Sequence, residues 1–129
     1  MALAAVDQLD QLSYRESLNR DFSDIVRYLA DSIGYKLTAY IAHRRHTERV
    51  QAWIDGKDSY GDVEARLRLA FRVVKLLRSR DSAAVVAAWL QGLNPELDER
   101  VPIAMLRDGM PQAEGKEVLA AARAYVAGG

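Results

Sequence analysis

The sequence predicts an all-α protein with about six or seven helices. Apolar residues recur every three or four positions in segments along most of the chain, which is the period of a helix that buries one face. No segment of the 129 residues shows convincing period-two alternation, the pattern of a half-buried strand. Half of the residues are hydrophobic, which is enough for a core, and the length suits one domain or two very small ones.

Residues 1–20 show a weak helical pattern without a firm cap, and we interpret them as a frayed or disordered arm or a dimer contact. Their aliphatic residues stand at steps of three: Leu3, Val6, Leu9 and Leu12. The first well-defined helix follows, capped by Asp21 and ended by Gly34. Its apolar face consists of Phe22, Ile25, Val26, Leu29 and Ile33.

Residues 35–57 predict two short helices joined by a tight polar turn that contains Arg44, Arg45 and His46. The side chain of Thr47 is expected to cap the second helix, and Gly56 to close it in a left-handed conformation. This arrangement is typical of a helix-turn-helix, whose second helix reads DNA. A plain helical hairpin has the same pattern and stays open as an alternative.

The longest periodic segment lies within residues 58–81, with acidic residues near its start and basic residues near its end, as the helix dipole favours. Its apolar face consists of Val63, Leu67, Ala70, Phe71, Val74 and Leu77. A further helix begins at Asp81 or Ser82, and a last one precedes the two terminal glycines. Trp53 and Trp89 stand on apolar stripes, so we expect both in the core. Tyr125, on the final turn, is expected to be a docking residue or a partner anchor.

The net charge is zero, but the charges are segregated along the chain. Residues 35–80 hold eleven Lys and Arg against five Asp and Glu, and each flank carries a balance of minus three. A basic module between two acidic ones suggests an anionic partner, and a solvated helix face is the alternative.

Six residues are candidates for contact with DNA: Arg44, Arg45, Thr47, Arg49, Gln51 and Lys57. Basic side chains gain affinity for phosphates by releasing counterions. Arg49 and Gln51 have the donor geometry for base edges in a major groove.

Enzymatic function is not expected. The chain has no cysteine, and the two histidines, His43 and His46, are separated by two arginines that oppose a divalent metal. No glycine-rich loop that could cradle a phosphate is visible, so we expect neither a metal nor a cofactor. No stretch approaches the roughly 18 apolar residues of a membrane span, and no signal peptide is apparent, so we expect no membrane association. A bacterial cytoplasmic location fits these features.

The segment "AWLQGLNPELDERVPIAMLRDG" resembles the C-terminal toxin-binding domain of the MbcA/ParS/Xre antitoxin family. The family pattern runs Trp, Asn-Pro, Leu, an Arg followed by Pro, an aliphatic pair and Gly. The matching residues are Trp89, Asn94, Pro95, Leu97, Pro102, Met105, Leu106 and Gly109. Downstream, "EVLAAARAYVAGG" looks like the closing helix of the family. The sequence departs from the pattern at Glu99 and His43, where glycine is usual or frequent.

The resemblance also covers the predicted helix-turn-helix. It implies a DNA-binding and dimerisation domain at residues 20–80, formed as a helix-turn-helix-like bundle, followed by a small helical toxin-binding domain at residues 81–129. It implies an antitoxin of a type II system that blocks the active-site cleft of a RES-domain toxin, which consumes NAD, and that represses its own operon as a homodimer or a larger complex. The antitoxin itself holds no NAD. The residues expected to contact the toxin are Arg123, Tyr125, Val126, Gly128 and Gly129. The alternative is a transcriptional regulator without a toxin partner.

Overall fold

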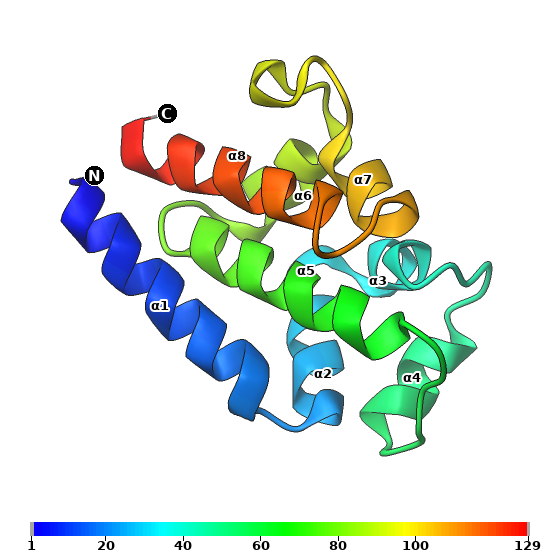
Figure 1. Ribbon diagram of the computed structural model, residues 1–129. Coiled ribbons are helices and arrows are strands. Elements are labelled where there is room, and N and C mark those ends of the chain that lie inside the picture. The colour runs from blue at the N-terminus through cyan, green and yellow to red at the C-terminus, as the bar shows by residue number, and fades with distance from the viewer. Residues whose placement is uncertain (1, 129) are drawn as a thin grey trace.

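The structure, a computed structural model, describes residues 2–128, which form eight α-helices and one 3₁₀ turn, with no strand among them. The elements are α1 (Leu3–Asn19), α2 (Phe22–Ile33), α3 (Tyr35–Ile41), α4 (Glu48–Ile54), α5 (Val63–Arg78), α6 (Ala83–Gln91), η1 (Pro95–Leu97), α7 (Pro102–Asp108) and α8 (Glu114–Gly128) (Figure 1). The all-α prediction is confirmed, and the helix count exceeds the predicted six or seven.

The central element is α5, which packs against α1, α2 and α8 (Figure 1). All six apolar residues expected on its buried face are at most 4% exposed: Val63, Leu67, Ala70, Phe71, Val74 and Leu77. The remaining helices add to the same core, which runs from Val6 in α1 to Val126 in α8. The segments expected as arm, DNA-binding domain and toxin-binding domain therefore share one hydrophobic cluster.

The structure differs from the predicted frayed arm, because α1 is a continuous helix of 17 residues. Hydrophobic burial explains little of its attachment, since Val6 is buried but Leu3 and Leu12 are mostly exposed. Polar bonds hold α1 to the neighbouring helices instead. The buried carboxylate of Asp10 accepts hydrogen bonds from Arg72 in α5 and from Arg123 in α8.

A second arginine of α5, Arg68, ties down the end of α1. Its guanidinium donates to the carbonyl oxygens of Ser17 at 2.7 Å and Arg20 at 2.9 Å, and to Glu64 at 2.8 Å. The last carbonyls of a helix lack partners within the helix, so a cation at this position satisfies them. The attachment of α1 thus depends on residues about fifty positions away.

The predicted caps are confirmed in part. Gly34 and Gly56 have positive φ values of 91° and 97°, which glycine adopts without the steric cost of a side chain. The side chains of Asp21 and Thr47 make no capping hydrogen bond, contrary to expectation. Thr47 has the right-handed helical conformation, with φ −85° and ψ −8°, whereas a capping residue is normally extended. Its backbone carbonyl alone accepts from the first turn of α4.

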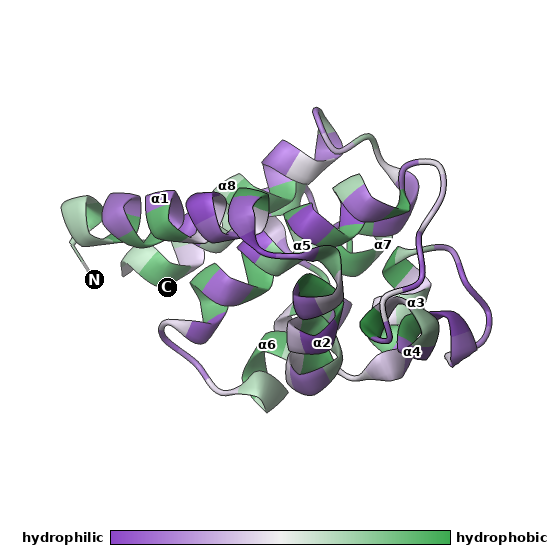
Figure 2. Cartoon of the chain, turned by 90° about the horizontal axis from the view of Figure 1, so that it is seen from below, coloured by the Kyte–Doolittle hydropathy of each residue, from purple (hydrophilic) through white to green (hydrophobic). Residues whose placement is uncertain are grey.

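The two tryptophans differ in burial. Trp53 is 2% exposed, as predicted, and its ring lies 6.0 Å from that of Phe22. Trp89 is only partly buried against the core, which corrects the expectation that it belongs fully to the interior. Its helix, α6, is hydrophobic along most of its length, in contrast to the hydrophilic turn between α3 and α4 (Figure 2). The partly exposed Trp89 makes the surface of α6 a candidate for binding.

Candidate functional site

The family-like segment folds as its two prolines predict. Oδ1 of Asn94 accepts a hydrogen bond from the backbone N–H of Glu96 at 2.9 Å and so caps η1. Pro95 and Pro102 begin η1 and α7, where the missing N–H costs no helical hydrogen bond. Gly109 ends α7. The segment therefore forms a scaffold of short helical turns, with Leu97 and Leu106 buried in it.

Within residues 2–128, three residues other than glycine have left-handed backbone conformations: His43 (φ 60°), Asp98 (φ 55°) and Glu99 (φ 64°). A side chain in this region costs about 1–2 kcal/mol. His43 and Glu99 are the two positions where the antitoxin family that this chain resembles favours glycine. Glu99 is held there because its backbone N–H donates to the carbonyl of Asn94 at 2.9 Å. At both positions the backbone has the conformation that glycine provides most readily.

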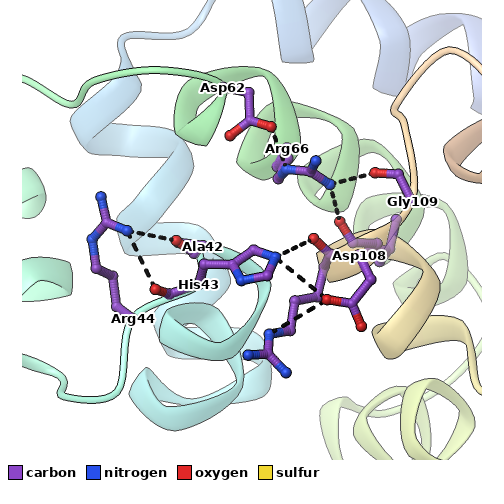
Figure 3. A network of polar contacts seen from close by, with 9 residues as sticks. Ala42, His43, Arg44, Asp62, Arg66, Asp108 and Gly109 are labelled. Atoms are coloured by element: carbon purple, nitrogen blue, oxygen red, sulfur yellow. Dashed lines mark hydrogen bonds and ion pairs between the residues drawn. The ribbon is translucent and has the colours of Figure 1, made fainter.

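The C-terminal end of α7 is held by side chains from α5 and from the α3–α4 turn (Figure 3). The guanidinium of Arg66 donates to the carbonyl oxygens of Leu106 at 3.0 Å and Gly109 at 2.5 Å, and also to Asp62 at 2.8 Å. Nε2 of His43 lies 2.7 Å from the carbonyl oxygen of Arg107, which can only accept, so this nitrogen carries the proton. These bonds satisfy carbonyls that lack partners within the helix.

Gly109 is required by a close approach rather than by its φ value. A Cβ atom at this position would lie 2.7 Å from the carbonyl oxygen of Met105 and 2.8 Å from Cγ of Glu114. Real Cβ atoms essentially never approach other heavy atoms this closely. Any side chain at Gly109 would therefore push the start of α8 away from the end of α7.

The residues expected to contact a toxin are placed differently from one another. Val126 is fully buried, so it packs in the core and presents no surface to a partner. Arg123 forms ion pairs with Asp7 and Asp10 of α1, which raise the pKa of its guanidinium. Tyr125 is partly exposed, Gly128 is exposed, and Gly129 lies outside the described residues.

Tyr125 and Gly128 line a groove of about 600 Å³ together with residues of the family-like motif. The groove lies between α6, η1 and α8, and its lining residues include Trp89, Leu93, Asn94 and Pro95. The rings of Trp89 and Tyr125 are tilted against each other with centroids 6.3 Å apart. Leu93, at the edge, leaves 70% of its surface exposed. The structure thus brings three residues of the motif and two of the expected toxin-contact residues into one largely apolar site.

Tyr125 is positioned from the α5–α6 connection. The guanidinium of Arg80 lies 5.0 Å from the centre of its ring and donates to its backbone carbonyl at 2.5 Å. A hydrogen bond to Asp81, and then burial, raise the pKa of the Tyr125 hydroxyl. A tyrosine hydroxyl is protonated at neutral pH already at its ordinary pKa, so it is the donor toward the Asp81 carboxylate.

The six DNA-contact candidates lie along the α3–α4 turn and α4. Arg45, Arg49 and Lys57 are exposed, and their side chains form no hydrogen bond or ion pair with any other residue that the structure describes. Arg44 donates to the carbonyl oxygens of Ala42 and His43, at 3.2 Å and 3.3 Å, and lies over Trp53.

The remaining two candidates are polar and uncharged. Gln51 accepts from the hydroxyl of Tyr35 at 2.9 Å and donates to Asp55 at 3.0 Å. Reading a base edge with Gln51 would therefore require these two bonds to break. The hydroxyl of Thr47, which does not cap α4, remains available to a ligand.

The basic character of residues 35–80 has two separate origins. Six of the cations, all between positions 66 and 80, have intramolecular partners: Arg66 with Asp62, Arg68 with Glu64, Arg72 with Asp10, Lys75 with Glu16, Arg78 with the carbonyl of Asp81, and Arg80 with the carbonyl of Tyr125. Two of these pairs, Arg72 with Asp10 and Lys75 with Glu16, join α5 to acidic residues of α1. The six cations give no support for an anionic partner, so that expectation now depends on the five cations of residues 36–57.

Two cations near the α3–α4 turn are not among the six DNA-contact candidates predicted from the sequence. Lys36 in α3 and Arg107 in α7 line a hollow of about 590 Å³ together with Arg44 and Arg45. Lys36 precedes the turn and was indistinguishable by spacing from a solvated lysine. Arg107 is separated from the turn by some sixty residues, and only the fold brings it there. The sequence carries no signal for this pairing.

Within residues 2–128, no group of three or more histidine, cysteine or acidic side chains is arranged to hold a metal ion. None of the helices in that range combines the length and apolar content needed to cross a bilayer. Comparison with protein-family models, curated proteins and solved structures finds no match to this chain. The placement of the chain's own residues and the motif resemblance are therefore the basis for its function.

Proposed function

We propose that this chain is the antitoxin of a type II toxin-antitoxin system and that it neutralises a RES-domain, NAD-consuming toxin through its C-terminal region. The groove between α6, η1 and α8 carries this proposal. It unites motif residues Trp89, Asn94 and Pro95 with Tyr125 and Gly128, two of the residues expected to contact a toxin. In this role the chain is a binding protein rather than an enzyme and needs no cofactor of its own.

The groove has the composition of a protein-binding surface. Tryptophan and tyrosine are enriched among residues that dominate binding energy, because they bury a large area with little loss of conformational freedom. Trp89 and Tyr125 supply such rings, and Leu93 adds an exposed apolar edge. The polar side chain of Glu96 lies at the same groove. A partner that inserts an apolar segment here would cover Leu93 and the exposed parts of both rings.

Two observations favour contact residues at the groove over the whole terminal segment. Removing residues 126–129 would delete the fully buried Val126, so a truncated chain would lose core packing together with any contact surface. Substitutions of exposed groove residues separate the two effects. Leu93 and Tyr125 are suitable because their side chains are exposed or partly exposed.

The proposed test is co-expression with the RES-type toxin encoded beside this chain, with growth and cellular NAD as readouts. We expect the wild-type chain to restore both, and Leu93→Gln combined with Tyr125→Ala to lose protection while remaining folded. Leu12→Gln is the matched control, because Leu12 is 54% exposed on α1, away from the groove. Full protection by the double variant, or a toxin that stays active beside the wild-type chain, would refute the proposal.

We also propose that the chain represses its operon as a dimer through α3, α4 and the turn between them. The exposed cations Arg45, Arg49 and Lys57 support this role, since they are free to meet phosphates. Replacing Arg49 with Ala is expected to weaken binding to the promoter fragment by about 1–3 kcal/mol if it reads a base. The alternative function, a regulator without a toxin partner, predicts DNA binding with no protection from any neighbouring gene product.

A further inference from the structure

The hollow beside the α3–α4 turn concentrates positive charge more than any other site described above. Lys36, Arg44, Arg45 and Arg107 line it, together with His43 and His46. The described residues that line it carry no carboxylate, but Oδ1 of Asp108 lies 3.4 Å from Nε2 of His43 and 3.8 Å from Nε of Arg107. Its volume of about 590 Å³ is within the range of small-ligand sites.

The four cations around this hollow repel each other, and among the described residues only Arg107 of the four has an acidic side chain within ion-pair distance. The arginines of α5 each have an acidic side chain or carbonyl groups as partners. In the hollow, Lys36 and Arg45 are exposed, and neither forms an ion pair within the described chain. An anion placed among them would remove the repulsion and gain charge-assisted hydrogen bonds.

Two of the four cations are already held in place. The guanidinium of Arg107 lies 4.6 Å from the centre of the Tyr40 ring. Its Nε is buried and has no hydrogen-bond partner, because Oδ1 of Asp108 is 3.8 Å away. Arg44 is fixed by two carbonyl groups of the turn and by Trp53. Arginines held in this way lose little further freedom when they bind, which favours affinity.

The ligand chemistry follows from the donors. Guanidinium groups match the geometry of phosphate oxygens, and lysine adds a mobile point charge. Thr47, at the same hollow, has a hydroxyl that does not cap α4 and can donate to a phosphate oxygen. We infer that this hollow binds a phosphate group, with Arg107 of α7 as a fixed anchor and Lys36 and Arg45 closing around it.

The site also connects the two halves of the chain. His43 donates to the backbone carbonyl of Arg107, so the turn and the end of α7 already touch (Figure 3). A phosphate bound by Arg45 on one side and Arg107 on the other would fasten the turn to α7. The phosphate belongs either to a DNA backbone or to a free polyphosphate compound. A DNA backbone as the source rests on the proposed function of this chain, whereas a free polyphosphate compound does not.

The experiment uses sodium pyrophosphate and a promoter duplex as probes, with the full-length protein at low ionic strength. Calorimetry gives the pyrophosphate affinity, and fluorescence anisotropy gives the duplex affinity across a salt series. Arg107→Gln is the principal variant and Lys36→Gln, at an exposed position, is the second one. Arg27→Gln is the matched control, because Arg27 lies on α2 with 53% of its side chain exposed.

We expect Arg107→Gln to weaken pyrophosphate binding about 5- to 100-fold. Lys36→Gln should weaken this binding by a smaller factor. The affinity of the Arg27→Gln control should stay within about twofold of wild type. If a DNA phosphate occupies the hollow, duplex affinity falls too, and the slope of log affinity against log salt decreases by about one. A duplex that binds unchanged while pyrophosphate binding falls identifies a free compound as the ligand.

The experiment distinguishes failure of the proposed DNA binding from failure of the phosphate site. If the promoter duplex does not bind at all, but pyrophosphate binds through Arg107, the DNA part of the proposed function fails and the phosphate site stands. If neither probe responds to Arg107→Gln and Lys36→Gln beyond the response to Arg27→Gln, the phosphate site is overturned. Urea unfolding of each variant checks that lost binding is not lost folding.

Discussion

Replacing Asp10 with asparagine is expected to weaken the attachment of α1 to the rest of the molecule. Asp10 is 6% exposed and accepts hydrogen bonds from Arg72 at 3.0 Å and 3.2 Å, and from Arg123. Asparagine has almost the same volume, so the substitution removes the negative charge without creating a cavity. It leaves two arginines partly buried beside a neutral amide.

The magnitude follows from the exposure of the three groups. Removing one partner of a buried ion pair costs about 3–5 kcal/mol. The side chains of Arg72 and Arg123 are 23% and 35% exposed, so water compensates part of the loss. Asparagine also keeps one acceptor oxygen. We therefore expect the free energy of unfolding to fall by about 2–3 kcal/mol, below the full cost of a buried pair.

Urea unfolding followed by circular dichroism measures this loss. With a slope of about 1–3 kcal/mol per molar urea, the midpoint should fall by about 0.7–3 M. Asp24→Asn is the control, because Asp24 pairs with Arg27 on the surface, with both side chains about half exposed. Exposed pairs contribute about 0–1 kcal/mol. If Asp10→Asn is no more destabilising than Asp24→Asn, the argument that ion pairs hold α1 is wrong.

Two further predictions concern the family-like segment. Gly109→Ala should destabilise the protein by about 1–3 kcal/mol in urea unfolding, because the added methyl group meets a backbone carbonyl. The methyl group of Gly115→Ala meets only the flexible end of the Leu69 side chain and should cost less. Equal losses of stability in the two variants would contradict this explanation. Glu99→Gly should stabilise the protein by about 0.5–1 kcal/mol, because glycine adopts the left-handed conformation without steric cost. Glu96→Gly should destabilise the protein by a similar amount. Thermal unfolding of the two variants tests the sign of both effects.

The Asp10 prediction also bears on the proposed toxin contacts. Arg123 is bonded to Asp7 and Asp10, so an Arg123 variant that lost neutralisation would do so partly through a loosened α1. A double-mutant cycle between Asp10 and Arg123 separates the contributions, since a structural pair shows coupling of about 0.5–3 kcal/mol without any toxin. The groove residue Leu93 offers a test that is free of this complication.

Local signals in the sequence determine most of the helices. Apolar spacing places α2, α5 and α8, because a helix that buries one face must repeat its apolar residues every three or four positions. Asn94 determines the start of η1 through a hydrogen bond to a residue two positions away, and Pro95 and Pro102 favour the first turns of η1 and α7 through their fixed φ and missing N–H. Such interactions act over a few residues, so they can be predicted from the sequence.

The tertiary structure alone decides how the charged residues are used. The sequence shows a basic middle between acidic flanks, but whether an arginine faces solvent or a partner depends on the path of the chain. The pairing of Asp10 with Arg72 spans 62 positions, and that of His43 with Arg107 spans 64. A surface charge and an interhelical ion pair can have the same local sequence. For this reason the sequence could predict the helices, whereas the anchored α1, the apolar groove and the basic hollow become visible only when distant segments are brought together.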